Sequence, residues 1–277
     1  MIFEDVIHPV NDRGALRFAL RGFKMVKKSS VAYFNIPSAF DIETSSFYYK
    51  GEKCAIMYAW AFSLNGVVFA GRTWDEFHAF LHDIEKLIKY DIYNRFVIYV
   101  HNLSYEFQFI RKRFTWEKVF SIKERKPCTA LTTSGLEFRC SYYQSGKSLE
   151  SIGESIYTKY GIKKEVGALD YDLLRHSNTT LTDREWLYIR RDVDVLCAYV
   201  YDTMMKDGGI HKIKQTKTGY VRDYMRKKTI YGENRYNYTK KIKHLKMCEL
   251  EYRMLLEAFA GGFTHANPWI VGDVIND

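Results

Sequence analysis

The chain has 277 residues, of which 47% are hydrophobic and 27% are charged, a balance that excludes a disordered or fibrous protein. Its longest apolar run covers only residues 54–62, and its acidic start, MIFEDVIHPV, is not a signal peptide, so we expect a cytoplasmic protein without a membrane partner. The net charge is +9, and five cysteines without a C-x-x-C pair exclude a disulfide framework and a zinc ribbon.

Predicted strands and helices alternate along the first three quarters of the chain. In chain order we predict a strand at 31–41, a hairpin of strands at 55–64 and 67–70, a helix at 73–88, a strand at 95–102, a helix from 104, a strand at 136–144, a helix at 148–160 and a long helix at 182–206. Asn65-Gly66 is a hairpin turn, and capping boxes begin the helices at Thr73 and Thr182. The order predicts the α/β class, with a mixed sheet flanked by helices.

The positive charge is concentrated near the carboxyl end. Residues 206–246 contain 13 Lys or Arg and 3 Asp or Glu, whereas the other 236 residues together carry about −1. The same segment contains five tyrosines, and cations among aromatic rings suit phosphates and unstacked bases, although a solvated basic surface without a partner is the alternative. We therefore divide the chain into an extension at 1–30, a domain at 31–205 and a basic, aromatic segment at 206–277. The predicted DNA-backbone contacts are Lys227, Lys228, Lys240 and Lys241.

Two carboxylates stand at the end of the first predicted strand. Asp41 and Glu43 are two residues apart, so in a strand they leave on the same face. Like charges held together require a cation between them, and oxygen ligands without His or Cys favour Mg²⁺ or Mn²⁺. The same tripeptide recurs at Asp83 and Glu85 inside a predicted helix, where these two side chains do not face each other, and we interpret it as surface charge.

A third carboxylate lies on the long helix. Tyr188 and Asp192 are four residues apart, so the phenol and the carboxylate share one helix face. Asp194 is the rival ligand, but it points away from the face of Tyr188. The alternative is a tyrosine that is hydrogen bonded to an aspartate on the helix surface, without a metal.

Three motifs in order carry a resemblance to a known family. Asp-Ile-Glu-Thr at 41–44, His-Asn-Leu-Ser-Tyr-Glu at 101–106 and Tyr-Ile-Arg-Arg-Asp at 188–192 are similar to the exonuclease motifs of the protein-primed family B phage DNA polymerases. The segment FAGGF at 259–263 resembles the Gly-Gly joint that precedes the polymerase domain of that family. The resemblance implies a ribonuclease H-like fold and a 3′-to-5′ exonuclease that proofreads a primer end with two Mg²⁺ or Mn²⁺ ions.

The resemblance also implies roles for individual residues. Asp41, Glu43, Glu106 and Asp192 would bind the metals, with Glu106 where the family usually has Asp, and Tyr188 would orient the attacking water. The family's lysine near the third motif has no clear counterpart, and Lys163 and Lys164 are the two candidates. The residues expected to hold single-stranded DNA are Thr44, Tyr99, His101, Asn102, Tyr105, Ser148 and Leu149; a histidine packed in the core is the alternative for His101.

The polymerase motifs of the family do not occur in the chain. We therefore expect a fragment or a subunit of a split polymerase, with DNA, a terminal protein and a polymerase domain or subunit as candidate partners. One alternative function is a binding module that holds the primer strand or the terminal protein without cutting. A weaker alternative is trimming of RNA at the same site.

Overall fold

The computed structural model describes residues 3, 5–165, 170, 173–231, 236, 240–241, 243, 247–260 and 263–264. The chain divides into two compact units, Met1–Gly219 and Tyr220–Asp277. Residues 1–30, predicted as an extension, contribute two strands and a helix to the first unit. In the part of the chain that is described, no helix is both long and apolar enough to cross a membrane. All five cysteines are free thiols.

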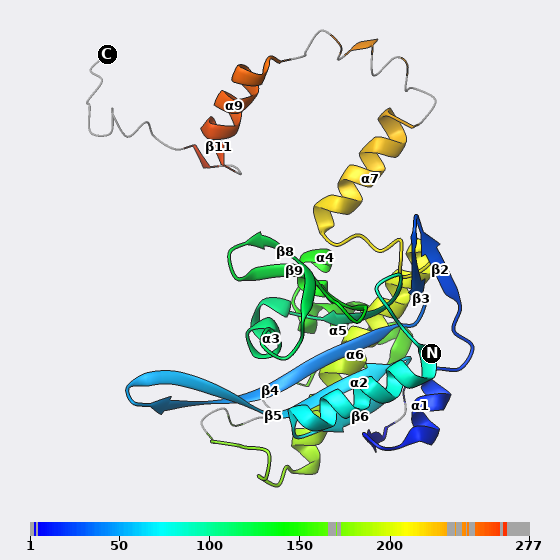
Figure 1. The fold of residues 1–277 in the computed structure, drawn as a ribbon, viewed down its shortest axis with the longest axis vertical. Helices are drawn as coiled ribbons and strands as arrows, with labels where there is room; N and C mark the ends of the chain where they lie inside the picture. The colour runs from blue at the N-terminus through cyan, green and yellow to red at the C-terminus, as the bar shows by residue number, and fades with distance from the viewer. Residues whose placement is uncertain are drawn as a thin grey trace. The chain divides into compact units, whose positions relative to one another are not determined.

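The first unit is built on a mixed sheet of ten strands (Figure 1). The strands are β1 (Ile7–Pro9), β2 (Met25–Lys28), β3 (Val31–Phe34), β4 (Ser38–Tyr49), β5 (Glu52–Leu64), β6 (Val67–Gly71), β7 (Asn94–Val100), β8 (Trp116–Lys123), β9 (Lys126–Thr132) and β10 (Leu136–Cys140). Their order is β1-β6-β5-β4-β7-β10-β9-β8, with β2 paired to β3 and β3 paired to β7. The pairs β1–β6, β4–β7, β3–β7 and β7–β10 are parallel, and the others are antiparallel.

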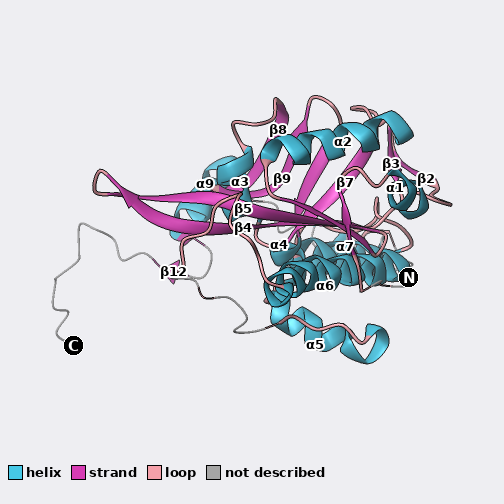
Figure 2. Ribbon diagram, turned by 90° about the horizontal axis from the view of Figure 1, so that it is seen from below, coloured by secondary structure: helices cyan, strands magenta, loops and turns pink. Residues whose placement is uncertain are grey.

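Helices cover both faces of this sheet (Figure 2). The helices of the first unit are α1 (Arg13–Ala19), α2 (Trp74–Ile88), α3 (Leu103–Ile110), α4 (Ser141–Ser145), α5 (Leu149–Tyr160) and α6 (Asp183–Asp207), whereas α7 (Lys217–Thr229) crosses the boundary between the two units. Side chains of α1, α2 and α3 pack with Phe40, Trp60 and Phe62 in one core, whereas α5 and α6 pack with Ala39 and Ala61 in a second core. The second unit contains α9 (Glu249–Ala258), β11 (Phe259–Ala260) and β12 (Phe263–Thr264).

The predicted α/β class, with a mixed sheet flanked by helices, is confirmed. Both predicted capping boxes are present: Thr73 and Thr182 each accept a hydrogen bond from the backbone N–H three residues later. The predicted single strand at 31–41 is wrong because β3 ends at Phe34 and β4 begins at Ser38, with Pro37, which lacks a backbone donor, between them.

The strand predicted at 136–144 is too long, since β10 ends at Cys140 and the next five residues form α4. The hairpin of β8 and β9 and the helix α7 were not predicted. Every residue of β8 except Trp116 is exposed, so this strand lacks the apolar and polar alternation that identifies a half-buried strand.

Candidate metal centre and its cleft

The central strand β4 positions Asp41 and Glu43. Alternation along β4 turns Phe40 and Ile42 into the core under α2 and turns Asp41 and Glu43 to the face that carries α6. The strand pairs with β7 only at Ala39, and beyond this point the two strands separate. Asp41 therefore lies directly past the last pair of two parallel strands, where a sheet opens a crevice.

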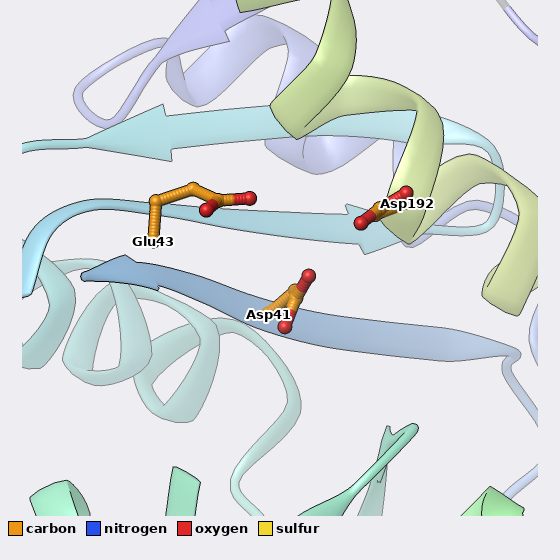
Figure 3. Close-up of side chains that lie close together, drawn as sticks. All are labelled: Asp41, Glu43 and Asp192. Carbon is orange, nitrogen blue, oxygen red and sulfur yellow. The ribbon is translucent and has the colours of Figure 1, made fainter. Parts of the chain in front are cut away.

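Helix α6 brings the third carboxylate to the same point. Single ligand oxygens of Asp41, Glu43 and Asp192 all lie within 4.8 Å of one another, and Figure 3 shows the three side chains directed toward a common space between β4 and α6. Tyr188 is one turn earlier on α6 and is 6% exposed. Asp194 is outside the cluster and has Arg190 as its ion-pair partner, with 3.4 Å between Oδ2 and Nε.

The second copy of the tripeptide behaves as surface charge. On α2, Asp83 lies 3.7 Å from both the Lys86 ammonium and the Arg13 guanidinium, and Glu85 lies 3.3 Å from His82. These pairs are partly or fully exposed, and they do not approach the cluster. The same three residues thus form part of the carboxylate cluster in a strand and carry only surface charge in a helix.

Burial and mutual repulsion disfavour the charged forms of the three carboxylates. Burial and the charge of Asp192 raise the pKa of Asp41 to about 7. Burial, followed by the charges of Asp41 and Asp192, raises the pKa of Glu43 well above its ordinary value. Burial also raises the pKa of Asp192, against the lowering effect of Lys164. Such a group of carboxylates favours a bound cation.

Lys164 supplies one positive charge at the edge of the cluster. Its ammonium nitrogen lies 2.5 Å from Oδ2 of Asp192 and 3.3 Å from the hydroxyl of Tyr188, and it stands 4.9 Å from the centre of the Tyr188 ring. Of the two lysines left open by the sequence, Lys164 thus reaches the carboxylates, whereas Lys163 is exposed. The charge of Lys164 also lowers the pKa of Asp41 and of Glu43.

Glu106 adds a fourth carboxylate from α3. It is 5% exposed, and burial followed by the charge of Asp41 raises its pKa well above the ordinary value. Within the described chain, Oε2 of Glu106 and Oδ1 of Asp192 are buried without a hydrogen-bond partner. Buried carboxylate oxygens that accept no hydrogen bond, in an all-oxygen set, fit divalent Mg²⁺ or Mn²⁺.

Asp41, Glu106 and Asp192 line a cleft of about 680 Å³, whereas Glu43 is not among its lining residues. His101 and Asn102 follow β7 directly and line the same cleft. Nδ1 of His101 lies 3.0 Å from Oγ of Ser141, and burial followed by the charge of Lys164 lowers the pKa of His101 to about 4, so the ring is neutral near pH 7. Asn102 occupies the N-cap of α3 but makes no side-chain cap bond, which leaves its amide available to a ligand.

Of the other predicted DNA contacts, Ser148 and Leu149 line this cleft, whereas Thr44, Tyr105 and Tyr99 do not. The hydroxyls of Thr44 and Tyr105 are hydrogen bonded to each other, and the Tyr105 side chain is 41% exposed. Ser148 and Leu149 line the cleft, although Oγ of Ser148 already accepts a bond from the first turn of α5. Tyr99 differs because it is 2% exposed in the second core, so its side chain is not on the cleft surface.

Sequence reasoning missed Tyr142. This residue of α4 is 46% exposed, lines the cleft and meets the His101 ring edge-on, with 5.9 Å between ring centres. Because β7 and β10 are parallel neighbours, the residues that follow the two strands lie together. A prediction that these two strands pair in parallel would therefore have placed Tyr142 beside His101. The predicted strand at 136–144 concealed it by placing Tyr142 inside the sheet.

The remaining predicted residues belong to the second unit or to undescribed positions. Lys227 and Lys228 are exposed on α7, and Lys240 and Lys241 are exposed. Gly261 and Gly262, which carry the resemblance to the Gly-Gly joint, lie outside the described residues.

Comparison with known proteins identifies the fold. No family model matches the sequence, and a search of curated proteins found no match. Among solved structures, the chain is similar to Phi29 DNA polymerase complexed with primer-template DNA and incoming nucleotides (16% identity, TM-score 0.55) and to its orthorhombic crystal form (16%, TM-score 0.56); each match covers 84% of this chain and 40% of that one. Phi29 DNA polymerase complexed with single-stranded DNA matches equally well, at 16% identity and TM-score 0.55 over 84% of this chain and 41% of that one. The chain thus spans about 40% of the length of these polymerases and shares their fold over most of its own residues.

Proposed function

We propose that this chain is a metal-dependent 3′-to-5′ exonuclease that removes nucleotides from single-stranded DNA, as the proofreading part of a protein-primed phage DNA polymerase with a ribonuclease H-like nuclease fold. The observation that carries the proposal is the convergence of Asp41, Glu43 and Asp192 from β4 and α6. Their order in the sequence and the fold shared with Phi29 DNA polymerase support it.

Asp41, Glu43, Asp192 and Glu106 would hold two divalent ions. When bound, such ions make hydroxide available near neutral pH and stabilise the leaving 3′ oxygen. Lys164 already contacts Asp192, and its ammonium would pair with the phosphate that is cut. The Tyr188 hydroxyl, 3.3 Å from Lys164, would orient the attacking water.

The other side of the cleft would hold the strand. Asn102 and neutral His101 offer hydrogen-bonding groups, and Tyr142 offers a ring face on which an unstacked base can lie. The exposed ring of Tyr105, outside the cleft lining, would offer a second such face. Unpairing a terminal nucleotide costs least at a mismatch, so a cleft that accepts only single strands would favour mismatched ends without reading bases.

The double variant Asp41→Ala, Glu43→Ala tests the proposal. We expect release of nucleotides from a 3′-labelled DNA oligonucleotide in Mg²⁺ or Mn²⁺ to fall by at least about 10³-fold, because two of the four carboxylates are lost. Binding of the same oligonucleotide, measured by fluorescence anisotropy, should remain within about threefold of the wild type.

Two comparisons complete this test. The matched control is Asp83→Ala, Glu85→Ala, which alters the second copy of the tripeptide on α2 and should leave cleavage unchanged. Two results would refute the proposal of a metal-dependent exonuclease at this cluster. One is cleavage that continues in the Asp41, Glu43 variant, and the other is wild-type cleavage that is insensitive to chelator. Intact binding by a wild type that never cleaves would instead identify a primer-strand or terminal-protein binding module, and faster loss of a matched RNA would identify an RNA substrate.

A further inference from the structure

The segment that follows α6 is basic and is fixed to the first unit. The backbone carbonyl of Ile210 accepts a hydrogen bond from Nη1 of Arg139 at 3.0 Å, and Ile210 and Ile213 are 0% and 4% exposed. The carbonyl of Gln215 accepts a bond from Sγ of Cys128 on β9 at 3.4 Å. Lysines on this segment are therefore held in place relative to the sheet, unlike those on a free tail.

Two contacts connect this segment to the elements that line the cleft. The side chain of Lys217 covers Gly146 at the end of α4, since a Cβ added to that glycine would lie 3.3 Å from Cδ of Lys217. Tyr142 and Lys126, which line the cleft, are on α4 and at the start of β9. The contact of Gln215 with Cys128 on β9 and that of Lys217 with α4 thus place the segment beside the cleft wall.

Lys214 lies between two anchored residues of the same segment. Ile213, which precedes it, is 4% exposed, and the carbonyl of Gln215, which follows it, accepts the bond from Cys128. A Cβ added to Gly219 would lie 3.2 Å from Cβ of Lys214, so the chain turns back beside this lysine. Lys214 is therefore held on the same short stretch as Lys217.

We propose that Lys126, Lys214 and Lys217, named here the basic rim, bind the phosphates of the single DNA strand whose 3′ end lies in the cleft. This inference rests on the proposed function and extends it to the part of the strand outside the site. A cleft of about 680 Å³ has the size of a small-molecule pocket, so a longer strand must continue across the surface. Grooves for single strands combine such cations with stacking rings, and Tyr142 supplies a ring at the cleft end of the rim.

The test measures binding in chelator, so it does not depend on cleavage. A labelled single strand of about 12 nucleotides is titrated with the full chain and with the variant Lys126→Gln, Lys214→Gln, Lys217→Gln at several salt concentrations. We expect affinity to fall at least about tenfold at low salt, and the slope of log K against log salt to become shallower by about 2, since each lost contact with a single strand removes about 0.7. Replacement of the same three lysines by Arg should retain both values.

The control variant Arg17→Gln, Lys86→Gln, Lys89→Gln removes the same net charge from α1 and the end of α2, which cover the other face of the sheet. Its affinity and salt slope should equal those of the wild type, and thermal unfolding should show that both variants are folded. Equal binding by the rim variant and the control variant would overturn the proposal, as would a loss confined to a duplex of the same sequence. A wild type that binds in this way but never cleaves would refute the exonuclease and leave the rim established.

Discussion

At the scale of single residues, Lys164 contacts the candidate site directly, yet the sequence did not distinguish it from its neighbour Lys163. Its ammonium contacts Asp192 and Tyr188 together. The segment 161–165 belongs to no helix or strand, and its course is set by tertiary contact: a Cβ on Gly153 of α5 would lie 3.2 Å from the backbone nitrogen of Lys164. No periodicity or capping pattern records such a contact, so two adjacent lysines could not be distinguished.

Replacement of Lys164 by Gln should therefore slow cleavage. The change removes a charge that pairs with Asp192, and we expect the rate on a labelled oligonucleotide to fall by about 10²-fold at saturating substrate, as happens when one donor to a reacting oxyanion is lost. Lys163→Gln is the matched control because its side chain is exposed next to the same position, and it should cleave at the wild-type rate. Equal rates for the two variants would remove Lys164 from the mechanism.

The carboxylate cluster also predicts how stability depends on pH. Because the pKa of Asp41 is raised to about 7 in the folded protein, the folded state holds more protons than the unfolded state between about pH 4 and pH 7. In chelator, the free energy of unfolding should therefore fall as the pH rises through this window. Added Mg²⁺ or Mn²⁺ should restore part of the lost free energy of unfolding above pH 7, where the cluster is charged.

Asp41→Asn removes one of the repelling charges and tests this prediction. In chelator at pH 8 we expect the variant to be more stable than the wild type by about 2 kcal/mol, and at pH 4 we expect the two to be equal. Urea unfolding at both pH values measures the difference. A variant less stable than the wild type at pH 8 would show that Asp41 is not under electrostatic strain in the metal-free protein.

At the scale of elements, the sequence identified those whose apolar pattern faces one core. The helix α2 places Phe77, Phe80 and Ile84 on one buried face and starts at a capping box, and α6 starts in the same way. The hairpin of β8 and β9 could not be identified because Val119, Phe120 and Ile122 are exposed beside lysines and no alternation remains. Whether such an exposed segment forms a strand depends on its tertiary contacts, which the local sequence does not reveal.

The turn between β9 and β10 depends on a glycine for two separate reasons. Gly135 has φ of +100°, and an added Cβ would lie 2.1 Å from the carbonyl oxygen of Asp91. The same residue joins β10 to β7, because its carbonyl accepts a hydrogen bond from the backbone of Phe96 at 3.1 Å. Since β7 and β10 deliver His101 and Tyr142 to the cleft, this turn supports the site.

Gly135→Ala should therefore destabilise the protein by about 3 kcal/mol or more, through backbone strain and displacement of the Asp91 segment. Gly51→Ala is the control: Gly51 also has positive φ, +82°, but nothing lies within 4 Å of its added Cβ. It should cost about 1 kcal/mol, the effect of the backbone conformation alone. Urea unfolding distinguishes the two, and equal losses would mean that the contact with Asp91 relaxes without cost.

At the scale of the whole molecule, the sheet brings together motifs that are far apart in the sequence. Asp41 and Asp192 are both in the candidate site because α6 packs across β4, and the ordered motifs were sufficient to predict this meeting. The basic rim was not predicted, since Lys126 begins β9 whereas Lys214 and Lys217 follow α6, and the proximity of these two segments depends on tertiary contacts. Charge counted along the sequence identified only the segment after residue 205.

The lysines of the second unit give the last prediction. On α7, Lys227 pairs with Asp223 at 3.0 Å, and the Lys228 ammonium stands 5.9 Å from the ring centre of Tyr224, so cations and a ring lie side by side as single-strand binding requires. Replacement of Lys227, Lys228, Lys240 and Lys241 by Glu should weaken DNA binding in chelator and make the salt slope shallower by up to about 3, at about 0.7 for each contact. Four reversals at Arg13, Arg17, Lys86 and Lys89 in the first unit control for net charge alone. If the salt slope of the second-unit variant stayed at the wild-type value, these lysines would be a solvated surface, and the phosphate contacts of the chain would belong to the first unit.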